Sequence, residues 1–501
     1  MRKLLLASAA MLGATAGLAS AQTSAPNPAQ GQLVAPYHAM SGANSNNNLT
    51  AAATPGPIAI PAPGTVVIRL NGRIEIDVSA NSTFADKATY PTTNALGSSN
   101  GNGPGLGNSY KLQPQGIGSY LRLYAGIDGL TTNGIRYGGV AELREDWGAQ
   151  GGSPSGNTSG QTMFVRRAFT YIANDRVGIL RLGQADGLIG LFDGGTITSQ
   201  AWDAGDGNLN GGAMQQEIGG NVSPPFVWLS QAGAEYGNNK VVYLSPQFFG
   251  FDAGVQYAPS TGNSFANASG NGALALGYNG TSGATAVQTS ICGSAQSSCA
   301  NLSSSSVAGD SARWINQYAA GIRYNGVIGP VALQAFGVYE GAGKVSDSNT
   351  SAARIYYDNL SFVNAGVAAT FAGLTLAADY IGGALNGQLA MRPTGGKSEN
   401  AEIVGVMYKI GALTLGANAG MIDSQGQASL TNISQRHELE AALGGNYVLA
   451  PGLALIFEYM YMQRHQGGYD FVLAANNPAG QGGRNNTVHA QGVMVGTTLT
   501  W

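Results

Sequence analysis

Arginine is the residue type whose spacing in this chain most clearly suggests chemistry. In the early part of the sequence it alternates with apolar residues; Arg69 and Arg73 share one parity, and Ile74 has the other. A guanidinium keeps its positive charge in water and offers five N–H donors. These positions therefore predict electrostatic handling of ions and polar solutes, although any one arginine could instead pair within the protein. The arginines with this parity are Arg69, Arg73, Arg122, Arg136, Arg144, Arg166 and Arg181.

A second set of charged residues is acidic and follows Gln184. This connection to Lys240 contains no Lys or Arg. Carboxylates facing an arginine-bearing wall would create a transverse field across a narrow aqueous gap, which orients dipolar solutes and disfavours apolar ones. The alternative is that the acids lie on an exposed loop and bind divalent ions. The acidic residues concerned are Asp186, Asp193, Asp203, Asp206 and Glu217.

Strands must position these side chains, because period-two alternation places one residue class on each face. In a membrane barrel the apolar face contacts lipid and the charged face lines the lumen, where Glu75, Asp77, Glu142 and Asp146 are interleaved with the arginines. Arg167 has lipid-facing parity, which snorkelling or a subunit contact would explain. The other residues with lipid-facing parity are Leu121, Leu123, Tyr137, Leu143, Phe169, Leu180 and Leu182.

Sixteen segments alternate in this way, and the connections between them are alternately short and long. Short turns at one rim and long loops at the other are typical of an outer-membrane β-barrel. A soluble β-sandwich, the alternative, does not explain this alternation. The predicted strands are 65–78, 118–131, 134–147, 162–173, 177–185, 239–245, 249–258, 312–325, 328–340, 359–371, 373–382, 400–410, 412–421, 435–449, 452–465 and 487–501.

Composition agrees with an exported membrane barrel. Residues 1–21 have a basic start, an apolar centre and an Ala-Ser-Ala end, as in a secretory signal. Residues 22–64 are rich in Ala, Pro and Asn and predict a flexible periplasmic arm, or alternatively a plug or partner-binding segment; 65–501 form the barrel. Only 10% of residues are charged and the net charge is −3, which excludes a nucleic-acid footprint. No later stretch is apolar enough for a spanning helix.

Cys292 and Cys299 are the only cysteines, and they predict one loop disulfide in an oxidising compartment. The four histidines are distant from them in sequence, so no metal site is predicted. No Ser, His and Asp arrangement suggests catalysis, and no cofactor is implied. The sequence therefore predicts a protein that is not an enzyme.

Several motifs resemble the general porins of Gram-negative bacteria. FVRRAFTYI at 164–172 and GILRLGQ at 178–184 resemble the fourth and fifth strands of that family, and KVVYLSPQFFGFDAGVQY at 240–257 resembles its sixth and seventh. YKIGALTLG at 408–416 resembles a later hairpin, and VGTTLTW at 495–501 resembles the terminal assembly signal. In the last strand Val493, Val495, Leu499 and Trp501 share one face.

The resemblance implies an all-β transmembrane antiparallel barrel of 16 strands whose third loop folds into the lumen. It also implies a homotrimer in the Gram-negative outer membrane, in contact with lipid and lipopolysaccharide and assembled by the barrel-assembly machinery. The function expected is passive diffusion of small hydrophilic solutes and ions. A sugar- or anion-selective channel is the alternative within the same class. An outer-membrane barrel hydrolase and an adhesive barrel are the alternatives from other classes.

Overall fold

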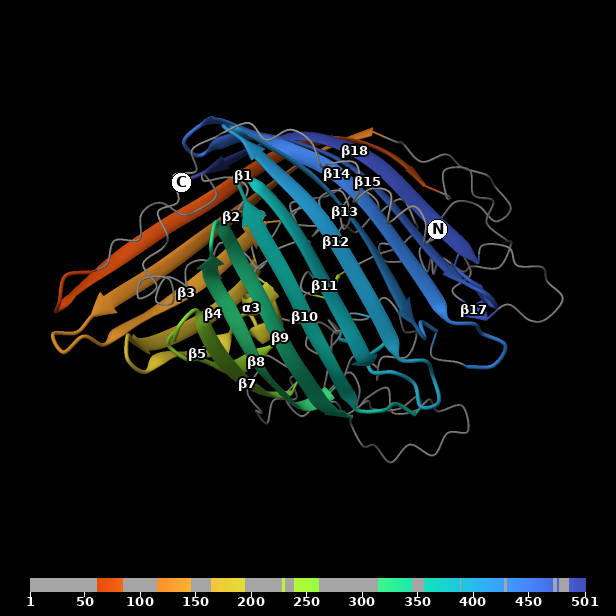
Figure 1. Cartoon of the computed structure of the whole chain (residues 1–501), viewed down its shortest axis with the longest axis horizontal. Coiled ribbons are helices and arrows are strands. Elements are labelled where there is room, and N and C mark those ends of the chain that lie inside the picture. Colours follow the sequence, from red (N-terminus) through yellow and green to blue (C-terminus); the bar gives the residue numbers. More distant parts are fainter. Residues whose placement is uncertain are drawn as a thin grey trace, which may run out of the picture.

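The barrel strands form a closed antiparallel sheet with the order β1-β18-β15-β14-β13-β12-β11-β10-β9-β8-β7-β6-β5-β4-β3-β2 (Figure 1). This computed structural model describes residues 61–83, 115–145, 164–193, 228–229, 238–260, 314–344, 356–387, 389–427, 430–471, 475–476 and 486–501. The strands are β1 Thr65–Thr83, β2 Gln115–Leu130, β3 Arg136–Glu145, β4 Phe164–Asn174, β5 Gly178–Gln184, β6 Asn239–Leu244, β7 Phe251–Ser260, β8 Trp314–Ile328, β9 Val331–Lys344, β10 Leu360–Phe371, β11 Leu374–Ala384, β12 Glu399–Ile410, β13 Leu413–Ser424, β14 Arg436–Ala450, β15 Leu453–Gln466 and β18 Thr487–Thr500.

All sixteen predicted strands are confirmed, with ends that shift by a few residues. The largest extension is in β1, which continues to Thr83. A two-stranded sheet of β16 (Tyr469–Asp470) and β17 (Ala475–Asn476) was not predicted, because strands of two residues are too short to show alternation. Within the described residues, none of the helices has the length and apolar character needed to cross a membrane.

Tight turns join the strands at one rim of the barrel, as predicted. The turn between β10 and β11 consists of Ala372 and Gly373, whose φ angles are 49° and 84°. Two successive residues with positive φ suit a two-residue hairpin, since this turn matches the twist of antiparallel strands. The predicted signal segment 1–21 and most of the predicted arm 22–64 lie outside the described residues, as do Cys292 and Cys299.

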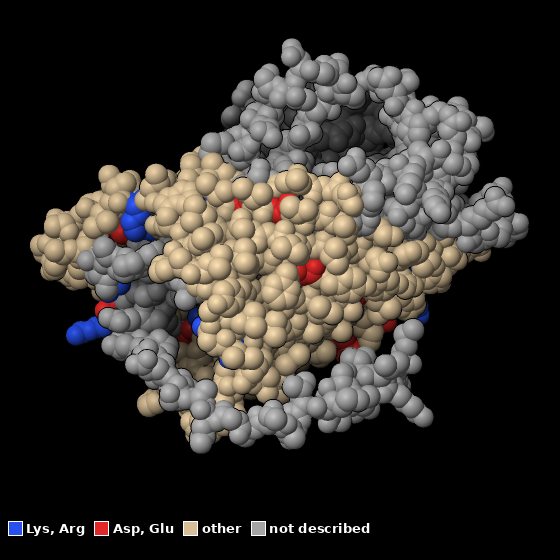
Figure 2. All heavy atoms as spheres, turned by 90° about the horizontal axis from the view of Figure 1, so that it is seen from above, with Lys and Arg blue, Asp and Glu red and all other residues tan. Residues whose placement is uncertain are grey.

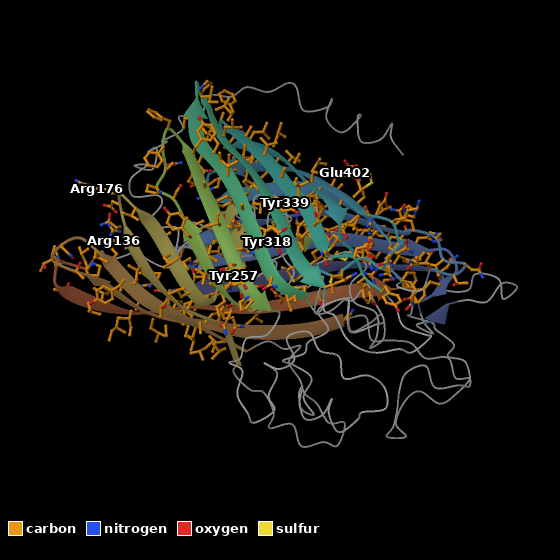
Figure 3. All side chains as sticks on the ribbon, turned by 90° about the horizontal axis from the view of Figure 1, so that it is seen from below. Arg136, Arg176, Tyr257, Tyr318, Tyr339 and Glu402 are labelled. Carbon is orange, nitrogen blue, oxygen red and sulfur yellow. The ribbon has the colours of Figure 1, made fainter. Side chains whose placement is uncertain are left out.

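The outward face of the barrel is apolar, as expected for a surface in contact with lipid. On β1, Ile68 is 80% exposed and Val78 is 53% exposed. The face of the molecule seen in Figure 2 carries few charged side chains. Tyr257, Tyr318 and Tyr339 form a row across β7, β8 and β9 near the ends of these strands that lead into the long connections (Figure 3). Such a row is typical of the aromatic belt at a membrane–water interface.

The inward face contains apolar residues as well as the expected charges. On the later strands, near the rim with the long connections, apolar side chains are almost fully buried. They join one hydrophobic cluster with residues of the connections, including Leu385, Leu389 and Phe471. Loop residues therefore pack into that end of the barrel. The inward apolar residues include Phe362, Ile381, Ile403, Ile422, Met460 and Met462.

The first and last strands close the barrel by direct pairing. The register runs from Arg73 opposite Thr500 to Thr83 opposite Ala490. Because β1 pairs with both β2 and β18, no barrel strand keeps an unpaired edge, as a sheet in lipid requires.

Candidate functional site

Alternation on β1 places its charged residues inside the barrel. Arg73, Glu75 and Asp77 are at most 7% exposed, whereas Ile74 and Ile76 between them point outward. Arg73 donates to Glu75 through its guanidinium. On the same strand Arg69 forms an ion pair with Asp128 of β2. The inward position of Arg69 and Arg73 agrees with the sequence prediction, and each has an acidic partner.

The central part of this inner face is a chain of alternating charges that crosses from β2 to β5. Arg122 Nε lies 4.0 Å from Glu142 Oε1, and both side chains are buried. Arg167 contacts Glu142 through Nη1, and its Nε and Nη2 lie 2.9 and 2.8 Å from Asp186 Oδ1. Asp186 is the second residue after β5, so Arg167 connects the barrel wall to the start of the long connection.

The predicted lipid-facing position of Arg167 is wrong. A β-bulge lies between Glu142 and Leu143 of β3, where Glu142 pairs with Arg167 but Leu143 pairs with Val165. The extra residue, Arg166, shifts the parity of the rest of β4 by one. Arg167 therefore faces the interior at 1% exposure.

Phe169 is corrected for the same reason. The prediction placed it toward lipid, but it is 4% exposed and lies on the inward face with Tyr171. Tyr171 donates to Asp128 on β2. The guanidinium of Arg181 lies over the Phe169 ring, 4.4 Å from its centroid.

Arg181 differs from the other inward arginines. Its side chain is 1% exposed, and within the described part of the chain none of its three nitrogens has a hydrogen-bond partner. Its neighbours are the Phe169 ring, the negative charge of Asp186 and the positive charge of Arg167. Arg181 therefore retains unused donor capacity inside the barrel.

The start of the connection after β5 turns into the barrel. Helix α3, Leu188–Asp193, is apolar, and Leu188, Ile189 and Phe192 are fully buried. Glycines on the facing strands leave room for it: a Cβ at Gly254 would lie 2.5 Å from Leu188 Cδ2, and one at Gly321 would lie 3.1 Å from Phe192 Cε2. Close approach of this kind requires residues without a side chain.

Polar side chains from the wall satisfy the ends of α3. The Leu188 amide donates to Gln256 Oε1 at 2.7 Å, and Arg323 Nη1 donates to the Leu191 carbonyl at 3.1 Å. Gln334 Nε2 donates to the Phe192 carbonyl at 3.3 Å. Helix ends leave backbone groups unpaired, and buried ones need such partners. Residues 185–193 are thus fastened to the inner wall of β7, β8 and β9.

Comparison with known proteins gives the family. The model of the family described as Gram-negative porin matches residues 7–467. The chain belongs to the Gram-negative porins. It is an outer-membrane channel and not an enzyme, as predicted from the sequence. No curated protein matches it.

Solved structures of similar fold include other bacterial porins. An anion-selective porin from Comamonas acidovorans is 14% identical, with 87% of this chain and 100% of that chain covered and a TM-score of 0.45. OmpT of Vibrio cholerae, as expressed in the outer membrane, is 12% identical, with 88% and 100% covered and a TM-score of 0.45. A mutant of the Rh. blastica porin is 13% identical, with 87% and 100% covered and a TM-score of 0.41.

Of the other predicted wall and loop residues, Arg136 lies away from this chain of charges, and the rest fall outside the described part of the structure. Arg136 lies at the rim with the short turns, together with Arg176 (Figure 3), and so lies away from the charge chain of β2–β5. The side chains of Arg144, Arg166 and Asp193 lie outside the described part of the structure, and so do residues Asp203, Asp206 and Glu217. In the last strand, the four residues of the predicted assembly signal are 44–60% exposed on the outward face: Val493, Val495, Leu499 and Trp501.

The sequence analysis missed a second charged region, on the later strands of the porin. Arg464 donates to Glu438, and Arg436 lies 5.5 Å from the ring centroid of Phe471. The same alternation that identified the early arginines would have identified Arg436, Glu438 and Glu440. Other buried carboxylates on this side are Glu340, Asp379, Glu399 and Glu458.

Proposed function

We propose that this porin is a constricted, water-filled channel for passive diffusion of small hydrophilic solutes and ions. The observation that carries the proposal is the contact of Arg167 with Asp186, which ties the segment before α3 to the inner wall. A segment held inside the barrel narrows the aqueous passage but does not close it. Fixed charges on both sides of the gap hold ordered water, which an apolar solute must displace.

The constriction in this proposal has an arginine side and an acidic side. Arg73, Arg122 and Arg181 belong to the wall, and Asp186 belongs to the inward segment. Ion pairs neutralise much of the wall, since Arg73 and Arg122 each lie beside a carboxylate. Arg181 has no hydrogen-bonded carboxylate among the described residues, so its charge is the least neutralised of the three and adds to the electrostatic field across the gap.

A preference for anions is the second candidate, and Arg181 is the observation that favours it. A guanidinium whose charge is not hydrogen-bonded to a carboxylate among the described residues attracts anions toward a narrow gap through its field. The Phe169 ring holds the guanidinium plane in position. If the channel prefers anions, its measured permeability to anions should be well above its permeability to cations.

Assembly is also part of the proposal. One related structure is described as the trimer form of a Vibrio cholerae protein. We expect this chain to form a homotrimer surrounded by lipid and lipopolysaccharide. The outward stripe ending in Trp501 is the proposed recognition signal for the barrel-assembly machinery, and Cys292 with Cys299 is the proposed loop disulfide.

Recording from planar lipid bilayers tests the channel. Purified porin should insert with stepwise conductance, and groups of three equal closing steps would support the trimer. Absence of conductance at every voltage would contradict a diffusion channel. The reversal potential in a salt gradient then separates an unselective channel from an anion-selective one.

A further inference from the structure

Three of the four histidines of this chain lie on the outward face of adjacent strands near the rim with the long connections. His437 is in β14, His465 in β15 and His489 in β18. The inward neighbours Arg436 and Arg464 are buried, so the parity of His437 and His465 is outward. The fourth histidine, His38, lies outside the described residues.

His437 and His465 are directly opposite each other in the register of β14 and β15. Directly opposite side chains on antiparallel strands have Cβ atoms about 4.5–5.5 Å apart. A zinc ion lies about 2.0–2.1 Å from an imidazole nitrogen, and other late first-row ions bind at similar range. Two imidazoles at this cross-strand spacing can therefore bind one ion between them.

One ring nitrogen of each histidine has a partner on a flanking strand. His437 Nδ1 lies 2.6 Å from Asp423 Oδ1, on the β13 side. His465 Nδ1 lies 2.8 Å from Thr487 Oγ1, on the β18 side. In the neutral imidazole of His437 the Nδ1 carries the proton, because a carboxylate only accepts, and the Nε2 lone pair remains for a ligand. A carboxylate behind a metal-binding histidine commonly fixes its tautomer and strengthens its binding.

This part of the outward face is polar, so ions from water can reach it. His437 is the second residue of β14, and His465 is followed only by Gln466 in β15. Tyr459 donates to Gln491 at 3.1 Å and Tyr461 donates to Gln463 at 2.9 Å on the same face. Polar side chains of this density are costly in hydrocarbon, which places the pair at the interface with water.

We propose that His437 and His465 form a two-histidine site for a late first-row divalent metal ion, with Asp423 as the positioning residue. In the described part of the chain no group of three or more His, Cys, Asp or Glu side chains is arranged to hold a metal. The site therefore has two protein ligands, and water completes the coordination. Among these ions Cu²⁺ binds such nitrogen ligands most tightly. A bound ion would join β14 to β15 at the outer rim.

Electron paramagnetic resonance of the purified porin with added Cu²⁺ tests this site. We expect one Cu²⁺ per chain with a splitting pattern from two imidazole nitrogens. His437→Ala and His465→Ala should each weaken Cu²⁺ binding at least tenfold, and Asp423→Asn should weaken it about 10-fold through the lost orientation of His437. His489→Ala is the matched control, because it removes an outward histidine of the neighbouring strand, and it should bind like the wild type.

Two results would overturn the proposal. One is equal Cu²⁺ binding by the wild type and by the double variant His437→Ala/His465→Ala. The other is loss of binding in His489→Ala to the same degree as in His437→Ala. Single-channel conductance of every variant should equal that of the wild type, because the substituted side chains point away from the lumen; this confirms that each variant is folded. If neither the wild type nor any variant conducts, that result would contradict the proposed channel function; the metal site is judged by Cu²⁺ binding alone.

Discussion

Trp501, the last residue, packs its ring against Gly72 of β1. The two residues exchange backbone hydrogen bonds, each of 3.2 Å. A Cβ atom at Gly72 would overlap the Trp501 ring. The strand that closes the barrel is thus fixed at its end by an aromatic side chain that needs a glycine beneath it.

Gly72→Ala should therefore weaken barrel closure. Overpacking of this kind costs about 1–3 kcal/mol, which should appear in denaturant unfolding followed by the gel mobility of the folded form. Gly337→Ala is the matched control, because nothing lies within 4 Å of a Cβ at that strand position. If Trp501→Ala is introduced first, Gly72→Ala should have no further effect; a persisting loss of stability would contradict the packing explanation.

Asp186→Asn should loosen the segment that enters the barrel. The substitution removes a buried negative charge from Arg167 and leaves Glu142 as its acidic partner. Breaking a buried ion pair costs about 3 kcal/mol at the lower end, so α3 should leave the wall more often. Bilayer recordings should then show larger or noisier conductance and a shift toward anions. Asp175→Asn, in the exposed turn between β4 and β5, removes the same charge and should leave both unchanged.

Arg181→Ala should shift the permeability ratio toward cations. Arg181 provides the guanidinium of the inner face that has no hydrogen-bond acceptor among the described residues, so its charge acts on passing ions. The reversal potential in a potassium chloride gradient measures the shift. Arg176→Ala serves as the control, since Arg176 is exposed at the rim (Figure 3) and should have little effect. Equal shifts in both variants would indicate a general surface-charge effect.

Acid should break the contact between Asp358, in the connection before β10, and the connection before β12, which contains Arg392 and Thr394. We call this contact the clamp. Asp358 accepts from Arg392 Nη2 at 2.6 Å and from Thr394 Oγ1 at 2.9 Å. Burial alone would raise the pKa of Asp358, but these hydrogen bonds outweigh burial and lower the pKa below its ordinary value of 3.8. A lowered pKa means that the clamp is complete above pH 3.8 and is lost as pH falls through the lower folded value.

Hydrogen exchange of the segment around Asp358 measures this release. Protection of the Asp358 amide, which donates to the Arg392 carbonyl at 2.9 Å, should fall between pH 5 and pH 2 after correction for intrinsic rates. In Asp358→Asn protection should already be low at pH 5 and should change little with acid. Unchanged protection at pH 2 in the wild type would show that the carboxylate does not hold the clamp.

Period-two alternation was sufficient to predict every barrel strand and the inward direction of Arg73 and Arg122. It failed on β4, where the extra residue Arg166 exchanges the inward and outward positions in the rest of the strand. Nothing in the residue types of β4 indicates this bulge. The packing of α3 against the barrel wall also could not be predicted from the residue types and their spacing. It depends on Gly254 and Gly321 lying beside Phe192, and contacts between distant strands are not encoded in local spacing.

The bulge beside Glu142 shows how this barrel tolerates a change in strand length. In a strand whose neighbours are lipid on one side and water on the other, a single-residue insertion exchanges the two environments for all residues beyond it. The bulge absorbs the inserted residue, so that Val165 and Arg167 both keep suitable surroundings. A strand of this barrel can therefore hold one extra residue without rebuilding its neighbours, and the sheet stays closed.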